Sequence, residues 1–132
     1  MEAVRPLPTA LEARPGGIEI VLFSQADCEF CAEIRDHYLR PLMAERRPAI
    51  AVAESRIDAD LPIRDWQGRS TTQRLFSAGQ GVRFAPTVMF FDASGRSLAP
   101  PIVGLSTDFF GSYLDQRIAV ALAAARRSDN RP

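Results

Sequence analysis

The sequence lacks lysine altogether: its 16 basic residues are all arginine, and 16 acidic residues balance them. The absence of lysine excludes Schiff-base chemistry and the lysine of a phosphate-binding loop. The formal net charge of zero argues against nucleic acid as a partner, because phosphate binding requires a surplus of basic charge on one face. No apolar run approaches the roughly 18 residues of a membrane-spanning helix, so we expect no transmembrane segment.

The chain of 132 residues has the length of one domain. We expect residues 1–17, which are rich in proline, arginine and glycine, to be a lead-in with a short helical turn at 9–14. Residues 18–125 then form the domain and 126–132 a flexible tail. The first 25 residues show no secretory-signal pattern. We therefore expect a cytoplasmic protein or one whose signal sequence has been removed.

Three short apolar runs predict strands at residues 18–23, 49–57 and 87–91. The turn at 92–95 predicts a hairpin whose second strand includes 102–103. Helices are expected after Asp27, which would cap the first, around 70–79 after a cap at Ser70 or Thr71, and from about 106–108. Pro41 should kink or end the first helix, and residues 58–68 should be irregular. This order predicts an α/β fold with three parallel strands, an antiparallel hairpin, and helices on both faces of a central mixed sheet.

The only two cysteines, Cys28 and Cys31, form a Cys-Glu-Phe-Cys segment shortly after the first predicted strand. Positions i and i+3 share a helix face, so the two sulfurs can meet. Backbone amides and the positive dipole at a helix start stabilise a thiolate. We predict that Cys28 is the exposed attacking sulfur and that Cys31, one turn further in, is the sheltered resolving sulfur.

Two other interpretations of the cysteine pair compete with redox chemistry. A purely structural disulfide would close so short a loop that it constrains the unfolded chain little. A zinc site commonly has four ligands, whereas this chain offers two cysteines and one histidine, His37. Because a Cys-x-x-Cys pair in a strand–helix context is typical of redox proteins, we expect no metal and no cofactor beyond the redox-active disulfide.

With a second segment, the pair resembles the thioredoxin superfamily. Residues 84–92 read Phe-Ala-Pro-Thr-Val-Met-Phe-Phe-Asp, and in that superfamily the proline before such a strand has a cis peptide bond and faces the cysteines. The resemblance covers roughly residues 18–122. It implies a thioredoxin-like fold, a cis Ala85–Pro86 bond, and backbone groups of Ala85 and Pro86 that pair with an extended substrate. It also implies a divergent bacterial, periplasmic protein, with the cytoplasm as the alternative.

Three further side chains lie beside the cysteines in the sequence. Phe30 is expected either to contact substrate or to pack in the core with Ile34, four residues away. Asp27 and Glu29 place negative charge beside Cys28 and should make the pKa of Cys28 less depressed. Both acids are equally suited to capping the helix and complementing its dipole. Their charge leads to the hypothesis of a comparatively reducing protein.

These patterns together predict a monomeric thiol–disulfide oxidoreductase that acts as a reductase rather than an oxidase. Its expected partners are a disulfide-bearing protein substrate and an upstream thiol–disulfide electron donor. Two alternatives stay open. One is a redox-sensing or partner-binding module on the same fold that does not turn over, and the other is a metal carrier that uses both thiolates.

Overall fold

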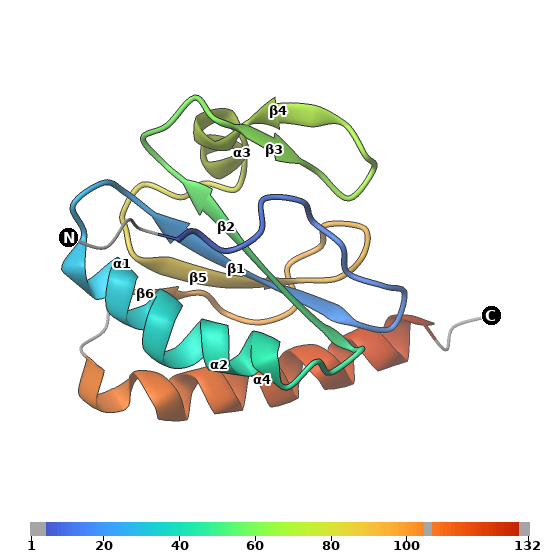
Figure 1. Ribbon diagram of the computed structural model, residues 1–132. Coiled ribbons are helices and arrows are strands. Elements are labelled where there is room, and N and C mark those ends of the chain that lie inside the picture. The colour runs from blue at the N-terminus through green and yellow to red at the C-terminus, as the bar shows by residue number, and fades with distance from the viewer. Residues whose placement is uncertain (1–4, 105–106, 130–132) are drawn as a thin grey trace.

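The computed structural model describes residues 5–104 and 107–129 and contains a four-stranded mixed sheet with helices on both faces (Figure 1). The strand order is β2–β1–β5–β6, and a separate two-stranded sheet consists of β3 and β4. These features confirm the predicted α/β class and central mixed sheet. The elements in chain order are β1 (Ile18–Ser24), α1 (Glu29–Ile34), η1 (Arg35–Leu39), α2 (Arg40–Ala44), β2 (Ile50–Arg56), β3 (Pro62–Arg64), β4 (Ser70–Thr72), α3 (Gln73–Gly79), β5 (Thr87–Phe91), β6 (Ile102–Val103) and α4 (Thr107–Asp129).

The central strand β1 leads directly to the cysteines, and all seven of its residues are buried. Helices α1, α2 and α4 cover one face of the sheet, and α3 with the β3–β4 hairpin covers the other (Figure 1). Because side chains alternate along a strand, Ile20 and Leu22 belong to one apolar cluster, and Val21 and Phe23 to the other. Burial on both faces explains why this strand reads as an almost continuous apolar run.

Strand β5 corrects the predicted topology. β1 pairs with β2 in parallel, as expected, but β5 runs antiparallel to β1, with Thr87 opposite Phe23. A parallel crossover has to carry the chain back along the sheet. Between β2 and β5 the chain forms only the β3–β4 hairpin and the seven-residue α3, which is about 10 Å long. The chain therefore stays at the end of the sheet where β2 ends, and β5 starts from that end. The following hairpin is as predicted, since β6 is antiparallel to β5.

Residues 58–68 are not wholly irregular, because Pro62–Arg64 pairs with Ser70–Thr72. Helix α3 then starts at Gln73, and its cap is Thr72, whose hydroxyl accepts a hydrogen bond from the Leu75 N–H at 3.2 Å. The predicted helix is therefore present, but its cap lies one or two residues later than expected.

The helix that carries the cysteines differs from its prediction at two points. Its N-cap is Cys28, whereas Asp27 precedes the cap with a left-handed φ of 55°. Pro41 does not end the helix, which passes through the π-helical turn η1 and resumes as α2. A proline lacks the N–H that donates a hydrogen bond in a regular helix. The π-helical turn η1 ends at Leu39, two residues before Pro41.

The segment before β1 belongs to the core. Leu7 and Leu11 are buried, and the Glu54 N–H donates to the Pro8 carbonyl at 2.9 Å. The segment is non-helical, so the expected helical turn at 9–14 is wrong. Helix α4 continues to Asp129, past the expected boundary at 125. Neither α4 nor any other helix within residues 5–104 and 107–129 is long and apolar enough to cross a membrane.

Candidate redox site

Cys28 and Cys31 are joined by a disulfide at the start of α1, with their Cα atoms 5.2 Å apart. Cys31 is completely buried, whereas Cys28 is partly exposed. The Cys31 N–H donates to Sγ of Cys28 at 3.1 Å, so the sulfur occupies the acceptor position of a helix cap. An external thiol or disulfide can therefore reach Cys28, while Cys31 is sheltered behind it.

Several segments meet at the end of the sheet that carries the cysteines (Figure 1). Strands β1 and β2 end there, and β5, α1 and α4 begin there. The Ala85–Pro86 peptide bond before β5 is cis, the isomer that the resemblance implied. Pro86 is buried, and its carbonyl accepts a hydrogen bond from the Gly104 N–H at 3.1 Å. The loops before β5 and after β6 thus lie side by side at this end.

Two exposed apolar side chains flank Thr87 at the same end. Phe84 is 71% exposed and Val103 is 48% exposed. The Phe84 carbonyl accepts a hydrogen bond from the Thr87 hydroxyl at 2.7 Å, and Val103 pairs with Thr87 across the strands. We call these two side chains the apolar rim. Neither side chain was predicted from the sequence as part of the site, although Phe84 immediately precedes the Ala-Pro pair.

The three side chains predicted beside the sulfurs have different surroundings. Phe30 is half-buried and packs against the apolar cluster beneath the helices, which is the packing alternative for that residue. Asp27 and Glu29 are exposed on either side of Cys28. Neither forms an ion pair with a described residue, so both leave uncompensated negative charge next to the accessible sulfur.

A cavity of about 530 Å³ opens beside Cys28. It is lined by Gln25, Ala26, Asp27, Cys28, Glu29, Ala32, Arg35 and Arg56. Arg56, the last residue of β2, pairs with Asp58 at 3.1 Å on the surface. The hydrogen bond from Arg56 lowers the pKa of Asp58.

The other arginine of the cavity belongs to a buried network. Arg35 donates from Nε to Oε1 of Glu54 at 2.9 Å and from Nη2 to Oε2 at 2.6 Å. Oε2 also accepts from the Ser24 hydroxyl at 2.6 Å, and Oε1 accepts from the Leu7 N–H at 3.0 Å. Burial alone would raise the pKa of Glu54, but the hydrogen bonds from these three partners outweigh it and lower the pKa.

This network was not predicted from the sequence, although the sequence contains two signals for it. Glu54 is an acid that directly follows the five apolar residues 49–53 of a predicted strand, where an unpaired charge would be costly. Arg35 lies four residues after Cys31 and therefore on the same inward face of the helix. Because a buried charge is costly unless an opposite charge pairs with it, these two residues are natural partners for each other.

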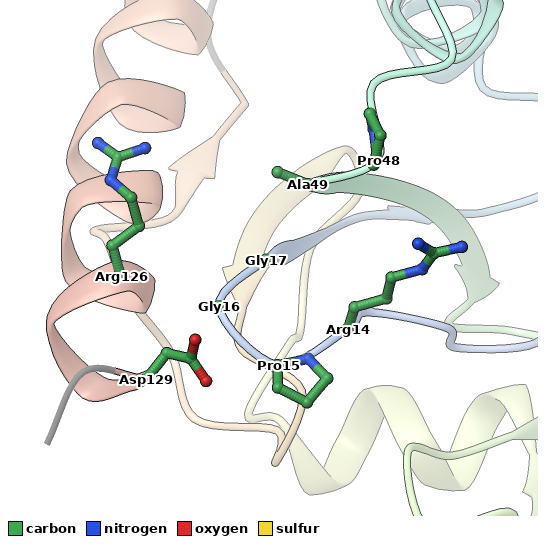
Figure 2. A pocket seen from close by; sticks show the side chains of 8 residues that line it. All are labelled: Arg14, Pro15, Gly16, Gly17, Pro48, Ala49, Arg126 and Asp129. Atoms are coloured by element: carbon green, nitrogen blue, oxygen red, sulfur yellow. The ribbon is translucent and has the colours of Figure 1, made fainter. Parts of the chain in front are cut away.

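A second cavity, of about 430 Å³, lies at the other end of β1. The Gly16–Gly17 turn lines it between Arg14 and Arg126, with Pro48 and Ala49 at the start of β2 (Figure 2). The cavity has no cysteine and is formed mainly by backbone turns. This cavity therefore lies at the opposite end of β1 from the Cys28–Cys31 disulfide.

In the described part of the chain, the side chains needed to complete a metal site do not gather at the cysteines. His37 is exposed on η1, where its Nδ1 lies 4.0 Å from Glu33 Oε1. Among the residues described, no three His, Cys, Asp or Glu side chains form a group that could hold a metal ion. Within that part of the chain, a metal carrier would depend on the two thiolates alone.

Comparison with solved structures places this architecture in the thioredoxin fold. Thioredoxin O2 from Arabidopsis thaliana in its oxidized state is 20% identical, with a TM-score of 0.54 over 76% of this chain and 75% of that one. A thioredoxin-fold protein from Helicobacter pylori is 14% identical, with a TM-score of 0.51 over 92% and 88%. Neither protein-family models nor curated proteins give a match to the sequence.

Fold and site together define a class. The chain has the thioredoxin fold, and its Cys-x-x-Cys pair forms a disulfide at the tip of the helix after the central strand. This combination defines a thioredoxin-fold domain that carries a Cys-x-x-Cys disulfide at a helix start.

Proposed function

We propose that this protein is an enzyme that reduces disulfide bonds in other proteins. The observation that carries the proposal is the asymmetry of the Cys28–Cys31 disulfide, in which one sulfur is accessible and the other is completely buried. Exchange with a partner needs one sulfur that the partner can reach, and release of the partner needs a second thiol that attacks the mixed disulfide.

Reduction of a substrate disulfide needs only the two cysteines of the dithiol form. In the dithiol form, the Cys28 thiolate attacks one sulfur of the substrate disulfide, and the other substrate sulfur leaves as a thiolate that takes a proton from solvent. Cys31 then loses its proton to solvent and attacks Sγ of Cys28. This second step breaks the mixed disulfide, releases the remaining substrate sulfur and forms the Cys28–Cys31 bond. Two electrons pass to the substrate, and an upstream dithiol donor restores the protein.

The charge at the accessible sulfur supports reduction rather than oxidation. Asp27 and Glu29 are exposed beside Cys28 and have no partner among the described residues. Negative neighbours disfavour the thiolate, and a less stabilised thiolate makes the dithiol form the better reductant. A redox potential of roughly −270 mV, in the range of reductants, would support this direction, and one of roughly −120 mV would contradict it.

The apolar rim supports a protein as the substrate. Phe84 and Val103 are exposed at the end of the sheet that carries the disulfide, where a protein substrate that reaches Cys28 would contact them. The Ala85 and Pro86 backbone lies beside them and would pair with an extended substrate segment. We also propose that the protein is a monomer and that it works in the periplasm. Size-exclusion chromatography of the native protein would test the first proposal, and separation of the periplasmic from the cytoplasmic fraction would test the second.

The test is dithiothreitol-dependent reduction of insulin, compared for the wild type, Cys28→Ser and Cys31→Ser. We expect turnover by the wild type and none by Cys28→Ser. Cys31→Ser, first reduced and then freed of dithiothreitol, should accumulate a mixed disulfide between Cys28 and insulin. A wild type that cycles between dithiol and disulfide without turning over insulin would contradict the enzyme and favour a redox-responsive binding module. Stoichiometric Cu(I) or Zn(II) that stays bound through purification would favour the metal carrier.

A further inference from the structure

We propose that Arg35, held in place by Glu54, is a positioning residue that stabilises the thiolate of Cys28. The proposal rests on the redox function proposed above. Arg35 forms its side-chain hydrogen bonds with Glu54 and not with either sulfur. It acts on Cys28 through its positive charge in the wall of the cavity that both residues line.

The geometry fixes where this charge lies. Arg35 is only 6% exposed, and it lines the cavity at Cys28, whereas Glu54 is not among the residues of that wall. The guanidinium presents Nε and Nη2 to the two carboxylate oxygens, at 2.9 and 2.6 Å. Arg35 thus forms part of the cavity wall that it shares with Cys28, whereas Glu54 does not, so the cation of the pair is its member on the cavity side.

The carboxylate is fixed as an anion and is not available as a base. An ionised carboxylate has about four acceptor positions. Here four hydrogen bonds occupy them, two from Arg35, one from Ser24 and one from the Leu7 N–H. These donors come from the helix, the end of β1 and the segment before β1. The network therefore holds the guanidinium rigidly but gives Glu54 no free position from which to accept a proton from a cysteine.

The other charges that face Cys28 make the contribution of Arg35 distinct. Asp27 and Glu29 are exposed and disfavour the thiolate, and Arg56 is matched by Asp58 at the surface. Exposed charges are screened by water and salt, whereas buried charges are screened much less. Arg35 is thus the buried cation of the cavity wall, and it opposes the two exposed acids.

The test is the pKa of Cys28 in the reduced protein, measured from the ultraviolet absorbance of the thiolate. Glu54→Gln leaves the arginine charge without its counter-charge, so we expect the pKa of Cys28 to fall by about half a unit to one unit. Arg35→Gln removes the cation, so we expect a rise of similar size. The Arg35→Gln, Glu54→Gln double variant, which leaves no unpaired buried charge, keeps the test available if Arg35→Gln does not fold. It should raise the pKa by a smaller amount.

A purely structural role of the pair would not change the pKa of Cys28 in opposite directions in Glu54→Gln and Arg35→Gln. Loosening of the helix would move the pKa of Cys28 in the same direction in both single variants, and that result would overturn the proposal, as would an unchanged pKa in Glu54→Gln. Arg40→Gln is the matched control, because Arg40 pairs with Asp36 on the exposed side of the same helical segment; it should leave the pKa unchanged. Insulin turnover, measured separately, tests the redox function itself.

Discussion

Glu19 is a completely buried acid on β1, at the end away from the cysteines. Its Oε1 accepts hydrogen bonds from the backbone N–H groups of Glu12 and Ala13, at 2.6 and 2.9 Å, and from Nε1 of Trp66 at 3.2 Å. Its Oε2 has no partner among the described residues. Burial raises the pKa of Glu19 from 4.5 to about 7, and the three hydrogen bonds offset only part of this effect.

The raised pKa fixes the sign of a pH effect on stability. The unfolded chain loses the Glu19 proton near pH 4.5 and the folded protein near pH 7, so folding becomes less favourable as the pH rises through this window. The full effect is about 3 kcal/mol, since each pKa unit corresponds to about 1.4 kcal/mol. About 2.5 kcal/mol of it falls between pH 5 and 8. Glu19→Gln removes the titrating group and should abolish this loss.

The measurement is urea unfolding at pH 5 and pH 8, followed by the fluorescence of Trp66, the only tryptophan. Glu54 and Asp58 have lowered pKa values and stay ionised in the folded protein throughout this range, so they add little to the pH dependence. Glu12→Gln is the matched control: it removes an exposed acid whose charge raises the pKa of Glu19 only slightly, and the loss should persist. Equal stability of the wild type at both pH values, or the same loss in Glu19→Gln, would refute the reasoning.

Three further substitutions test other parts of the structure. Leu7→Ala should lower the free energy of unfolding by about 2–5 kcal/mol in urea titrations, because Leu7 is 2% exposed; a loss below about 0.5 kcal/mol would show that the segment before β1 is not core. Gly17→Ala should also destabilise, since its Cβ would lie 2.9 Å from the Ala49 carbonyl oxygen, and unchanged thermal unfolding would contradict that close approach. Phe84→Ala should raise KM for insulin while leaving reduction of the disulfide by dithiothreitol unchanged; equal KM values would exclude Phe84 from substrate docking.

The parts of the fold that the sequence predicted are those with strong local signals. β1 and β5 are apolar runs bounded by turn residues, and the Asp92–Gly95 turn stands between two paired strands. The cysteine pair was found for the same reason, because a spacing of three residues at a helix start is a local property. Such features depend on a few neighbouring residues and need no knowledge of tertiary contacts.

The missed features depend on residues far apart in the chain. β3 and β4 have three residues each and little apolar pattern, and β3 is supported by the Arg64 N–H bond to the Thr9 carbonyl at 3.0 Å. The Arg35–Glu54 pair joins residues 19 positions apart, and its formation depends on the parallel register that places Glu54 opposite Leu22. The direction of β5 likewise depended on a hairpin that local patterns did not predict.

The two buried carboxylates show how donor chemistry, rather than burial, decides which acid titrates near neutral pH. Glu19 and Glu54 are both almost completely inaccessible, yet their pKa values move in opposite directions. Glu54 has a guanidinium on both oxygens, whereas Glu19 has only uncharged donors on one oxygen. The acid at the redox end therefore keeps its charge while the acid at the far end changes it. We therefore expect the pH dependence of stability to follow Glu19 at the far end of β1, and to change in Glu19→Gln without altering thiolate formation at Cys28.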